Sequence, residues 1–179
     1  MKQLSSLFLV PLFCAAFVAP IHAQNIFPSI SGETMENKVV SIPEDTEGKY
    51  TLVGMAYSED AERDMRTWYD ATYTMFIDKE GINAMVYDVE VKLVLMFTGV
   101  NKAATNKAMK NMAEIADEAL FPYVVFYKGE LKKYKSSLKL EDKNKPYIFV
   151  LDKQGKIIHR TSGRYTDKKM DVIGELVEE

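Results

Sequence analysis

The sequence predicts an α/β domain in which a mixed central sheet is flanked by helices. Two near-continuous apolar runs of strand length, 50–57 and 89–97, are each followed by a segment with helical periodicity. Two later runs, 147–151 and 156–160, enclose the turn Asp152–Gly155 and predict a β-hairpin. Helical crossovers join parallel neighbours, whereas a hairpin adds antiparallel strands, so the predicted sheet is mixed.

The elements follow in order along the first half of the chain. Residues 38–42 predict a short strand ended by Pro43, and 50–57 a buried strand. A helix is expected near residue 61, with Ser58 or Asp60 as its N-cap. Its apolar face is predicted to consist of Ala61, Met65, Trp68, Thr72 and Phe76. The run 89–97 predicts the next strand.

The second half of the chain predicts two more helices and another short strand. The strand is expected at 123–127, and the polar segment 128–142 is expected to form one helical turn plus a loop. A last helix is expected after Asp167, which would cap it. The predicted apolar stripes are Ala104, Ala108, Met112, Ile115 and Ala119 in the earlier helix, and Met170, Ile173, Leu176 and Val177 in the last.

The first 23 residues have the pattern of a secretory signal peptide. Lys2 precedes an apolar run of twelve residues, 7–18, and Ala23 offers a small residue before the cut. The run is shorter than the ~20 residues that a transmembrane helix needs. We therefore expect residues 1–23 to be removed, leaving 24–179 as a single domain without a transmembrane segment, soluble in the periplasm or another extracytoplasmic compartment.

Composition narrows the function classes. The chain has 179 residues, of which 47% are hydrophobic and 27% charged, so it is neither disordered nor a polytopic membrane protein. A net charge of −3 argues against nucleic acid as a partner. Its one cysteine, Cys14, lies in the predicted signal peptide. The expected mature protein therefore has no thiol.

Three segments resemble the thioredoxin-like superfamily, in its exported thioredoxin-like and peroxiredoxin-like branch. Residues 50–58 resemble the strand that enters the redox loop, 145–152 the proline-led strand that faces it, and 152–157 with Ser162-Gly163 the closing hairpin. Residues 25–49 are similar to the extended N-terminal segment and extra strands of that branch. The resemblance implies a thioredoxin-like three-layer fold with an N-terminal strand extension.

The chain departs from that family at the residues that carry redox chemistry. Oxidoreductases of this superfamily have a Cys-x-x-Cys or one peroxidatic cysteine where the first helix begins, because the helix N-terminus stabilises a thiolate. Here residues 58–63 read SEDAER. A serine hydroxyl cannot form a disulfide. Thiol–disulfide oxidoreductase or peroxidase activity is therefore not expected.

A narrower resemblance concerns the mitochondrial ATP synthase assembly factor, which is thioredoxin-like and independent of cysteine. The chain is similar to it in 51–53, Trp68, 144–152 and Ser162-Gly163. The resemblance implies an assembly role.

The candidate rim of a binding cleft consists of Ser58, Asp60, Lys145 and Pro146. Ser58 and Asp60 could instead only cap the helix. A cis peptide bond before Pro146 would keep a backbone edge open for an extended peptide, or the proline could serve folding geometry alone.

Other groups have a structural and a functional interpretation. His159 could join Asp60 or Glu62 in a non-thiol enzyme, but no catalytic spacing supports this. Met109 and Met112 could hold copper or fill the core, and aromatic residues of the first helix could stack on a ligand or pack inside. A lysine-rich stretch could attract an acidic partner or a phosphate-bearing surface, or be a solvated face; it comprises Lys132, Lys133, Lys135, Lys139, Lys143 and Lys145.

The sequence therefore predicts an exported, redox-inactive thioredoxin-like protein that binds an unidentified protein or peptide of the cell envelope as an assembly component. No cofactor, no metal and no catalytic residue is expected. A non-thiol enzyme, or a small-ligand or metal carrier using the same cleft, is the alternative.

Overall fold

A seven-stranded mixed sheet forms the centre of the computed structural model, which describes residues 25–99, 103, 105–115 and 117–178. The strand order is β2-β1-β5-β4-β3-β6-β7. Strands β3, β4 and β5 are parallel and the other pairs antiparallel, so the predicted mixed sheet is confirmed. The strands are β1 (Ile30–Thr34), β2 (Val39–Ile42), β3 (Tyr50–Ala56), β4 (Val89–Thr98), β5 (Val124–Gly129), β6 (Tyr147–Leu151) and β7 (Ile157–Ser162).

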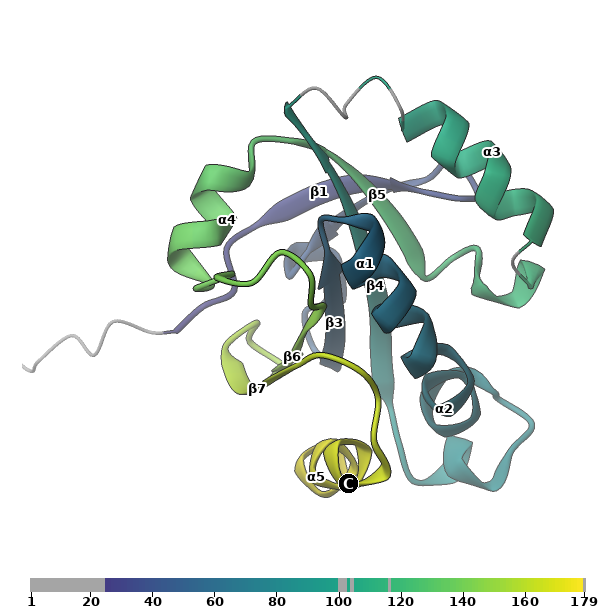
Figure 1. The fold of residues 1–179 in the computed structure, drawn as a ribbon. Helices are drawn as coiled ribbons and strands as arrows, with labels where there is room; N and C mark the ends of the chain where they lie inside the picture. Colours follow the sequence, from purple (N-terminus) through teal and green to yellow (C-terminus); the bar gives the residue numbers. More distant parts are fainter. Residues whose placement is uncertain (1–24, 100–102, 104, 116, 179) are drawn as a thin grey trace, which may run out of the picture.

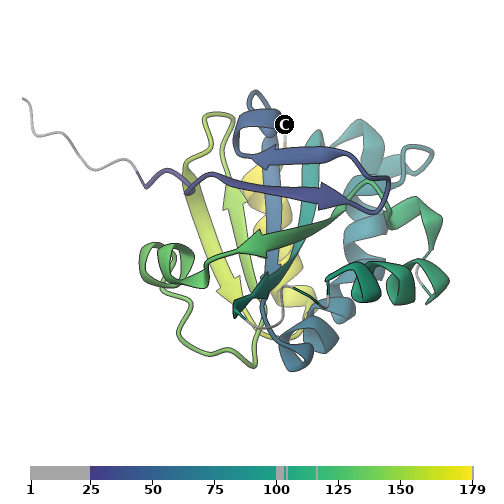
Figure 2. The same ribbon diagram turned by 90° about the horizontal axis from the view of Figure 1, so that it is seen from above.

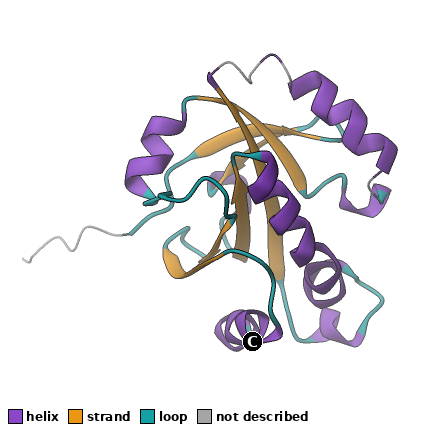
Figure 3. Cartoon of the chain, viewed as in Figure 1, coloured by secondary structure: helices purple, strands orange, loops and turns teal. Residues whose placement is uncertain are grey.

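Helices cover both faces of this sheet (Figures 1 and 3). Helices α1 (Glu59–Met65), α2 (Tyr69–Thr72), α3 (Thr105–Ile115) and α5 (Asp167–Val177) pack against one face. Helix α4 (Leu131–Ser137) and the segment before β1 pack against the other. Short 3-10 turns lie at Glu44–Thr46, Arg66–Trp68, Ile82–Met85 and Glu118–Leu120, and a π-helical turn spans Tyr73–Ile77. This is the expected three-layer arrangement.

The central strands are apolar on both faces, which explains their near-continuous hydrophobic runs. Leu93 and Leu95 of β4 pack beneath α1, whereas Val94 and Met96 belong to the core under α4. A strand that is buried on both sides has no solvent face and therefore no alternation.

The predicted face of the first helix is confirmed, although the helix is not uniform. Its five residues, from Ala61 to Phe76, are each 3% exposed or less. The segment runs from α1 through a 3-10 turn into α2 and ends in the π-helical turn. Ser58 is its N-cap and accepts a hydrogen bond from the Ala61 amide at 3.1 Å.

Two predictions for the last helix are wrong. Thr166, not Asp167, is the N-cap, because its side chain accepts a hydrogen bond from the Lys169 amide. Leu176 is 37% exposed. The buried stripe is Met170, Ile173, Gly174 and Val177, and Leu176 lies outside that spacing.

The middle of the chain differs from the prediction in its boundaries. Helix α3 ends at Ile115, and Ala119 lies in the separate turn Glu118–Leu120. Ala108 and Met112 pack against the core as predicted, whereas Ala104 lies outside the described residues. The polar segment 128–142 contains helix α4, seven residues long, which exceeds the single turn expected.

Strand β1 was absent from the predicted element order and lies between β2 and β5 in the N-terminal extension (Figure 2). Its sequence, ISGET, has a glycine at the centre and no strong strand pattern. A Cβ at Gly32 would lie 2.6 Å from Val125 Cγ1. The glycine is therefore needed for the close approach of β1 to β5, a tertiary contact that local sequence does not show.

In the part of the chain described here, no helix is both long and apolar enough to cross a membrane.

Candidate functional site

The candidate site lies where the parallel strands β3 and β4 end and helix α1 begins. In open α/β sheets the carboxyl ends of parallel strands are where loops and helix N-termini converge on ligands. Strand β3 ends at Ala56, and Glu59 already belongs to α1. Only Tyr57 and Ser58 separate the strand from the helix, so both are held tightly at the site.

Ser58 joins the helix to the loop that precedes β6. Its hydroxyl accepts the Ala61 amide and donates to the Lys143 carbonyl at 2.5 Å. The Ser58 hydroxyl thus both accepts and donates a hydrogen bond within the fold. The predicted capping role is present, and the structure adds the bond to the facing loop.

Two tyrosines hold the same loop. The Tyr57 hydroxyl donates to the Leu140 carbonyl at 3.0 Å, and the Tyr147 hydroxyl accepts from the Asp142 amide at 2.6 Å. Burial raises the pKa of Tyr57 to about 12, and the nearby Tyr147 and Asp142 act in the same direction. The loop 140–146 is therefore fixed to the ends of β3 and β6. Sequence reasoning missed both tyrosines, because their partners are backbone groups, 83 positions away for Tyr57 and five positions away across a loop for Tyr147.

Lys145 and Pro146 lie at the end of that loop. Lys145 is exposed and forms an ion pair with Asp142 at 3.1 Å. Pro146 is buried, and its carbonyl accepts a hydrogen bond from the Gly163 amide at 2.9 Å. Among the described residues the cis peptide bond precedes Pro43, so the bond before Pro146 is trans. The condition under which Pro146 would keep an edge open is not met.

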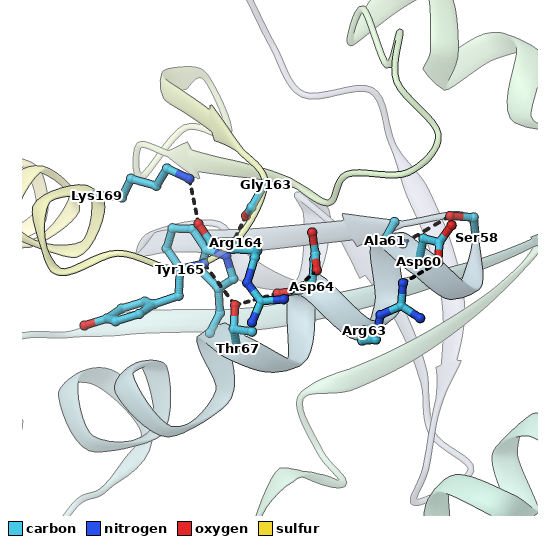
Figure 4. Close-up of polar contacts among 11 residues, drawn as sticks. Ser58, Asp60, Ala61, Arg63, Asp64, Thr67, Gly163, Arg164, Tyr165 and Lys169 are labelled. Atoms are coloured by element: carbon cyan, nitrogen blue, oxygen red, sulfur yellow. Dashed lines mark hydrogen bonds and ion pairs between the residues drawn. The ribbon is translucent and has the colours of Figure 1, made fainter.

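Asp60 points along the outside of α1. It is exposed and pairs with Arg63 at 2.5 Å (Figure 4). The structure thus brings Ser58 to the loop before Pro146, whereas Asp60 and Lys145 make separate local ion pairs.

A groove runs from the start of α1 toward α3, and we call it the α1–α3 groove. Its first hollow, about 150 Å³, is lined by Ala56, Ser58, Glu59, Leu95 and Phe97 among others. A second hollow of about 170 Å³ continues between Arg66, directly after α1, and Met112 of α3, over Phe126 of β5. Both hollows share Glu62 and Leu95. The groove therefore has an apolar floor and charged α1 side chains along its rim.

Strand β4 extends past β3 at this groove. β3 ends at Ala56, opposite Leu95, whereas β4 continues to Thr98. Met96, Phe97 and Thr98 pair with β5 on the other side only. In a parallel strand the backbone groups point to alternate sides, so this three-residue overhang presents backbone toward the place that β3 leaves. The longer second apolar run was the sequence signal for it.

The rim carries a mixture of charges. Glu62 pairs with Arg66 at 2.6 Å, one helical turn apart. Burial raises the pKa of Tyr69, next on the same helical face, to about 12, and Glu62 acts in the same direction. The Tyr69 hydroxyl is buried and has no hydrogen-bond partner among the residues that the structure describes. Glu59 is exposed and forms no ion pair within the described chain.

The opposite side of the helical segment is clamped to the residues after β7 (Figure 4). Arg164 pairs with Asp64 at 3.0 Å, and the Tyr165 amide donates to Thr67 Oγ1 at 2.9 Å. Trp68 Nε1 donates to the Gly163 carbonyl at 3.0 Å. These contacts fix the helix that forms one wall of the groove.

The family model described as "ATP10 protein" matches residues 20–179 of this sequence. The chain belongs to the ATP10 protein family. The predicted resemblance to the ATP synthase assembly factor is therefore confirmed at the level of the family. No curated protein matches the chain.

Solved structures show that this ATP10-family chain has the thioredoxin-like fold. The exposed lipoprotein thioredoxin Etrx1 from Streptococcus pneumoniae is 12% identical, with 83% of this chain and 99% of that chain covered and a TM-score of 0.57. BsSco, a member of the Sco family of cytochrome c oxidase assembly proteins, is 13% identical, with 86% and 92% covered and a TM-score of 0.57.

A thioredoxin domain of a thiol-disulfide oxidoreductase from Bacteroides vulgatus is 16% identical, with 87% and 98% covered and a TM-score of 0.52. At these identities the likeness concerns the fold alone. The ATP10-family chain has Ser58 between its strand and first helix, and its one cysteine is Cys14.

The remaining candidate groups do not converge on the ATP10-family site. His159 lies opposite Val150, which lies opposite Leu52, six residues before Ser58. At ~3.3 Å per residue, His159 is on the order of 20 Å from the start of α1, beyond the reach that shared acid–base chemistry requires. Met112 is buried and Met109 packs against the core. The described residues contain no cluster of three His, Cys, Asp or Glu that could hold a metal.

Proposed function

We propose that this ATP10-family chain is an exported, redox-inactive assembly component that binds an extended segment of a partner protein in the α1–α3 groove. The observation that supports this proposal most directly is the overhang of β4 past β3. An extended peptide can add to such an edge, since backbone hydrogen bonds supply affinity and adjacent pockets select side chains. This mode needs no cysteine.

The shape of the groove favours a peptide over a compact ligand. The groove consists of two hollows in a row, about 150 and 170 Å³, which share Glu62 and Leu95. Each could accept one apolar side chain of an extended segment, the first over Leu95 and Phe97 and the second over Leu95 and Phe126. Glu59 at the rim favours a basic residue in the partner segment.

The candidate rim is revised within this proposal. Ser58 shapes the groove through its bond to Lys143, and Asp60 lies at the outer edge. Lys145 and Pro146 lie at the end of the loop 140–146, which faces the start of α1. The ion pair of Lys145 with Asp142 and the bond between the Pro146 carbonyl and the Gly163 amide hold this loop in place. The overhang residues Met96–Thr98 take the place of Pro146 as the proposed edge.

Site-specific photo-crosslinking tests the proposal. A photoreactive residue at Glu59, where α1 begins, or at Thr98, the last residue of the overhang, is expected to capture the same envelope protein in cells. The same residue at Lys168 of α5, which is exposed and remote from the groove, is the control. Phe97→Asp, which places a charge in the groove, should abolish capture while the melting temperature confirms a folded variant.

Equal capture at Lys168, or none at Glu59 and Thr98, would overturn the peptide-binding proposal.

A separate assay tests the proposal that the protein is redox-inactive. Purified chain and its Cys14→Ser variant should be equally inactive in a disulfide-reduction assay, because a thiol is needed for exchange. The mass of the exported protein checks removal of residues 1–23.

A further inference from the structure

The lysine-rich stretch forms a continuous basic surface on α4 and the loop after it. Residues 131–145 hold six lysines and two acidic residues, a net charge of +4 in a chain whose total is −3. Tyr134 and Leu138 point into the core and are 4% and 3% exposed. The lysines around these two residues are exposed, and we call Lys132, Lys133, Lys135, Lys139 and Lys143 the α4 basic face.

The positive charge of this face is not neutralised within the fold. Lys145 is the one lysine of the stretch that pairs with a carboxylate among the described residues, and its partner is Asp142. Lys133 donates to the Ser29 carbonyl, which carries no net charge. Glu141 is the second acidic residue of the stretch and is exposed. Among the described residues, the other lysines of the stretch thus have no carboxylate partner.

Arg160 adds a fixed cation beside them. Its guanidinium donates to the Lys139 carbonyl at 2.8 Å and stacks over Tyr147, 5.1 Å from the ring centre. Lys139 itself has a left-handed backbone, φ 50°, at the end of α4. The bond from Arg160 therefore joins the edge strand β7 to the end of α4.

The described chain begins at the same place. Asn25 lines a hollow together with Lys139, Arg160 and Ile157, and its carbonyl accepts the Ile157 amide at 2.8 Å. Figure 1 shows the first described residues between α4 and β7. In the precursor, six residues lie between Val18, the end of the apolar run, and Asn25. The seven steps from Val18 to Asn25 span at most ~25 Å, so while the run is held in a bilayer the basic face stays near the headgroups.

We propose that the α4 basic face binds the surface of an anionic phospholipid membrane. After removal of residues 1–23 the lysines themselves must carry this binding. Clusters of four to eight basic residues on an amphipathic helix are typical of it, with each lysine near the surface adding to the affinity. Lysine is depleted in protein–protein interfaces, and the face has no aromatic anchor exposed among its lysines. The surface would hold the α1–α3 groove close to partners in the membrane, but membrane binding does not depend on the groove.

Vesicle co-sedimentation tests this inference. The wild-type chain and each variant are purified in the same form, with the N-terminus identified by mass. Wild type should bind vesicles of phosphatidylcholine with phosphatidylglycerol and not phosphatidylcholine alone, and salt should weaken the binding. Lys132→Gln/Lys135→Gln/Lys143→Gln should lower the partition coefficient roughly 100-fold, from three lost charges.

A matched triple variant controls for net charge. Lys107→Gln/Lys110→Gln/Lys168→Gln removes three exposed lysines from α3 and α5, and should leave binding within a factor of about three of wild type. Melting temperatures verify that all variants are folded. Equal effects of the two triples, or no preference for phosphatidylglycerol, would overturn the inference. It would also fail if the α4 face bound a polyglutamate peptide but not the vesicles, which would assign it to an acidic protein.

Discussion

Ser58 stands where redox members of this fold have a thiol, and its hydroxyl has two bonds that a thiol could not replace well. It caps α1 through the Ala61 amide and holds the facing loop through the Lys143 carbonyl. Its role as a candidate N-cap was predicted from the capping preference of serine alone. The second bond could not be predicted, because the two residues are 85 positions apart.

Replacing Ser58 by alanine should lower the free energy of unfolding by about 1–2 kcal/mol, since both the cap and the loop bond are lost. Ser58→Asp separates the two contributions, because aspartate caps a helix but cannot donate to Lys143. Urea unfolding of both variants provides the measurement. Wild-type stability for Ser58→Ala would show that neither bond contributes.

The four rim candidates differ in how far sequence could place them. Resemblance predicted that residues near 58 and 146 face each other, and Ser58 does contact the loop before Pro146. The trans peptide bond at Pro146 and the ion pair of Lys145 with Asp142 depend on the loop conformation, which has no signature in the sequence. Asp60 instead pairs with Arg63 three residues later on helix α1, a spacing that the sequence does show.

At the scale of elements, the helical segment from α1 to Phe76 is held by the segment between β7 and α5. Trp68 is 1% exposed, donates to the Gly163 carbonyl, and packs edge-on against Tyr165 at 5.6 Å. The apolar face of this helix was predictable from spacing. Its contact with residues 163–165 was not, because it joins elements 95 residues apart.

Trp68→Phe should therefore cost about 2–3 kcal/mol of unfolding free energy, because it opens space in the core and leaves the Gly163 carbonyl unpaired. Tyr165→Phe is the control: it keeps the aromatic contact and loses only the exposed bond to Asp167, with an expected cost below about 0.5 kcal/mol. Chemical unfolding compares them. Similar stabilities for the two variants would contradict the clamp.

The boundaries of an element were predicted best where its hydrophobic pattern alone determined them. The two long apolar runs became β3 and β4 with nearly the expected ends. Strand β1 was missed because Gly32 is required by its approach to β5 and weakens the local strand pattern. The length of helix α4 was underestimated because its polar residues outnumber its one buried residue, Tyr134, and Leu138 follows the last helical residue.

For the whole molecule, buried tyrosines make stability depend on alkaline pH. Burial raises the pKa of Tyr57 and of Tyr69 to about 12, and raises the pKa of Tyr134 as well. A tyrosine whose pKa is higher in the folded state binds its proton more tightly there. Its contribution is complete below the unfolded value of about 10 and is lost as pH rises toward 12.

The free energy of unfolding should accordingly fall between about pH 10 and pH 12. Native protein should ionise fewer of its ten tyrosines than denatured protein in that window, measured by tyrosinate absorbance. Tyr57→Phe should show a smaller pH-dependent loss, despite lower stability at neutral pH after losing the bond to Leu140. Identical titrations of native and denatured chains would refute this.

The sequence alone determined the class of fold, the apolar faces of the central strands and first helix, and the absence of a cysteine after Cys14. These follow from periodicity and residue chemistry, which are local. Only the tertiary structure decided the overhang of β4, the groove toward α3 and the assembly of the α4 basic face beside Asn25. Each depends on strand register and on contacts between distant segments, which arise when the whole core packs.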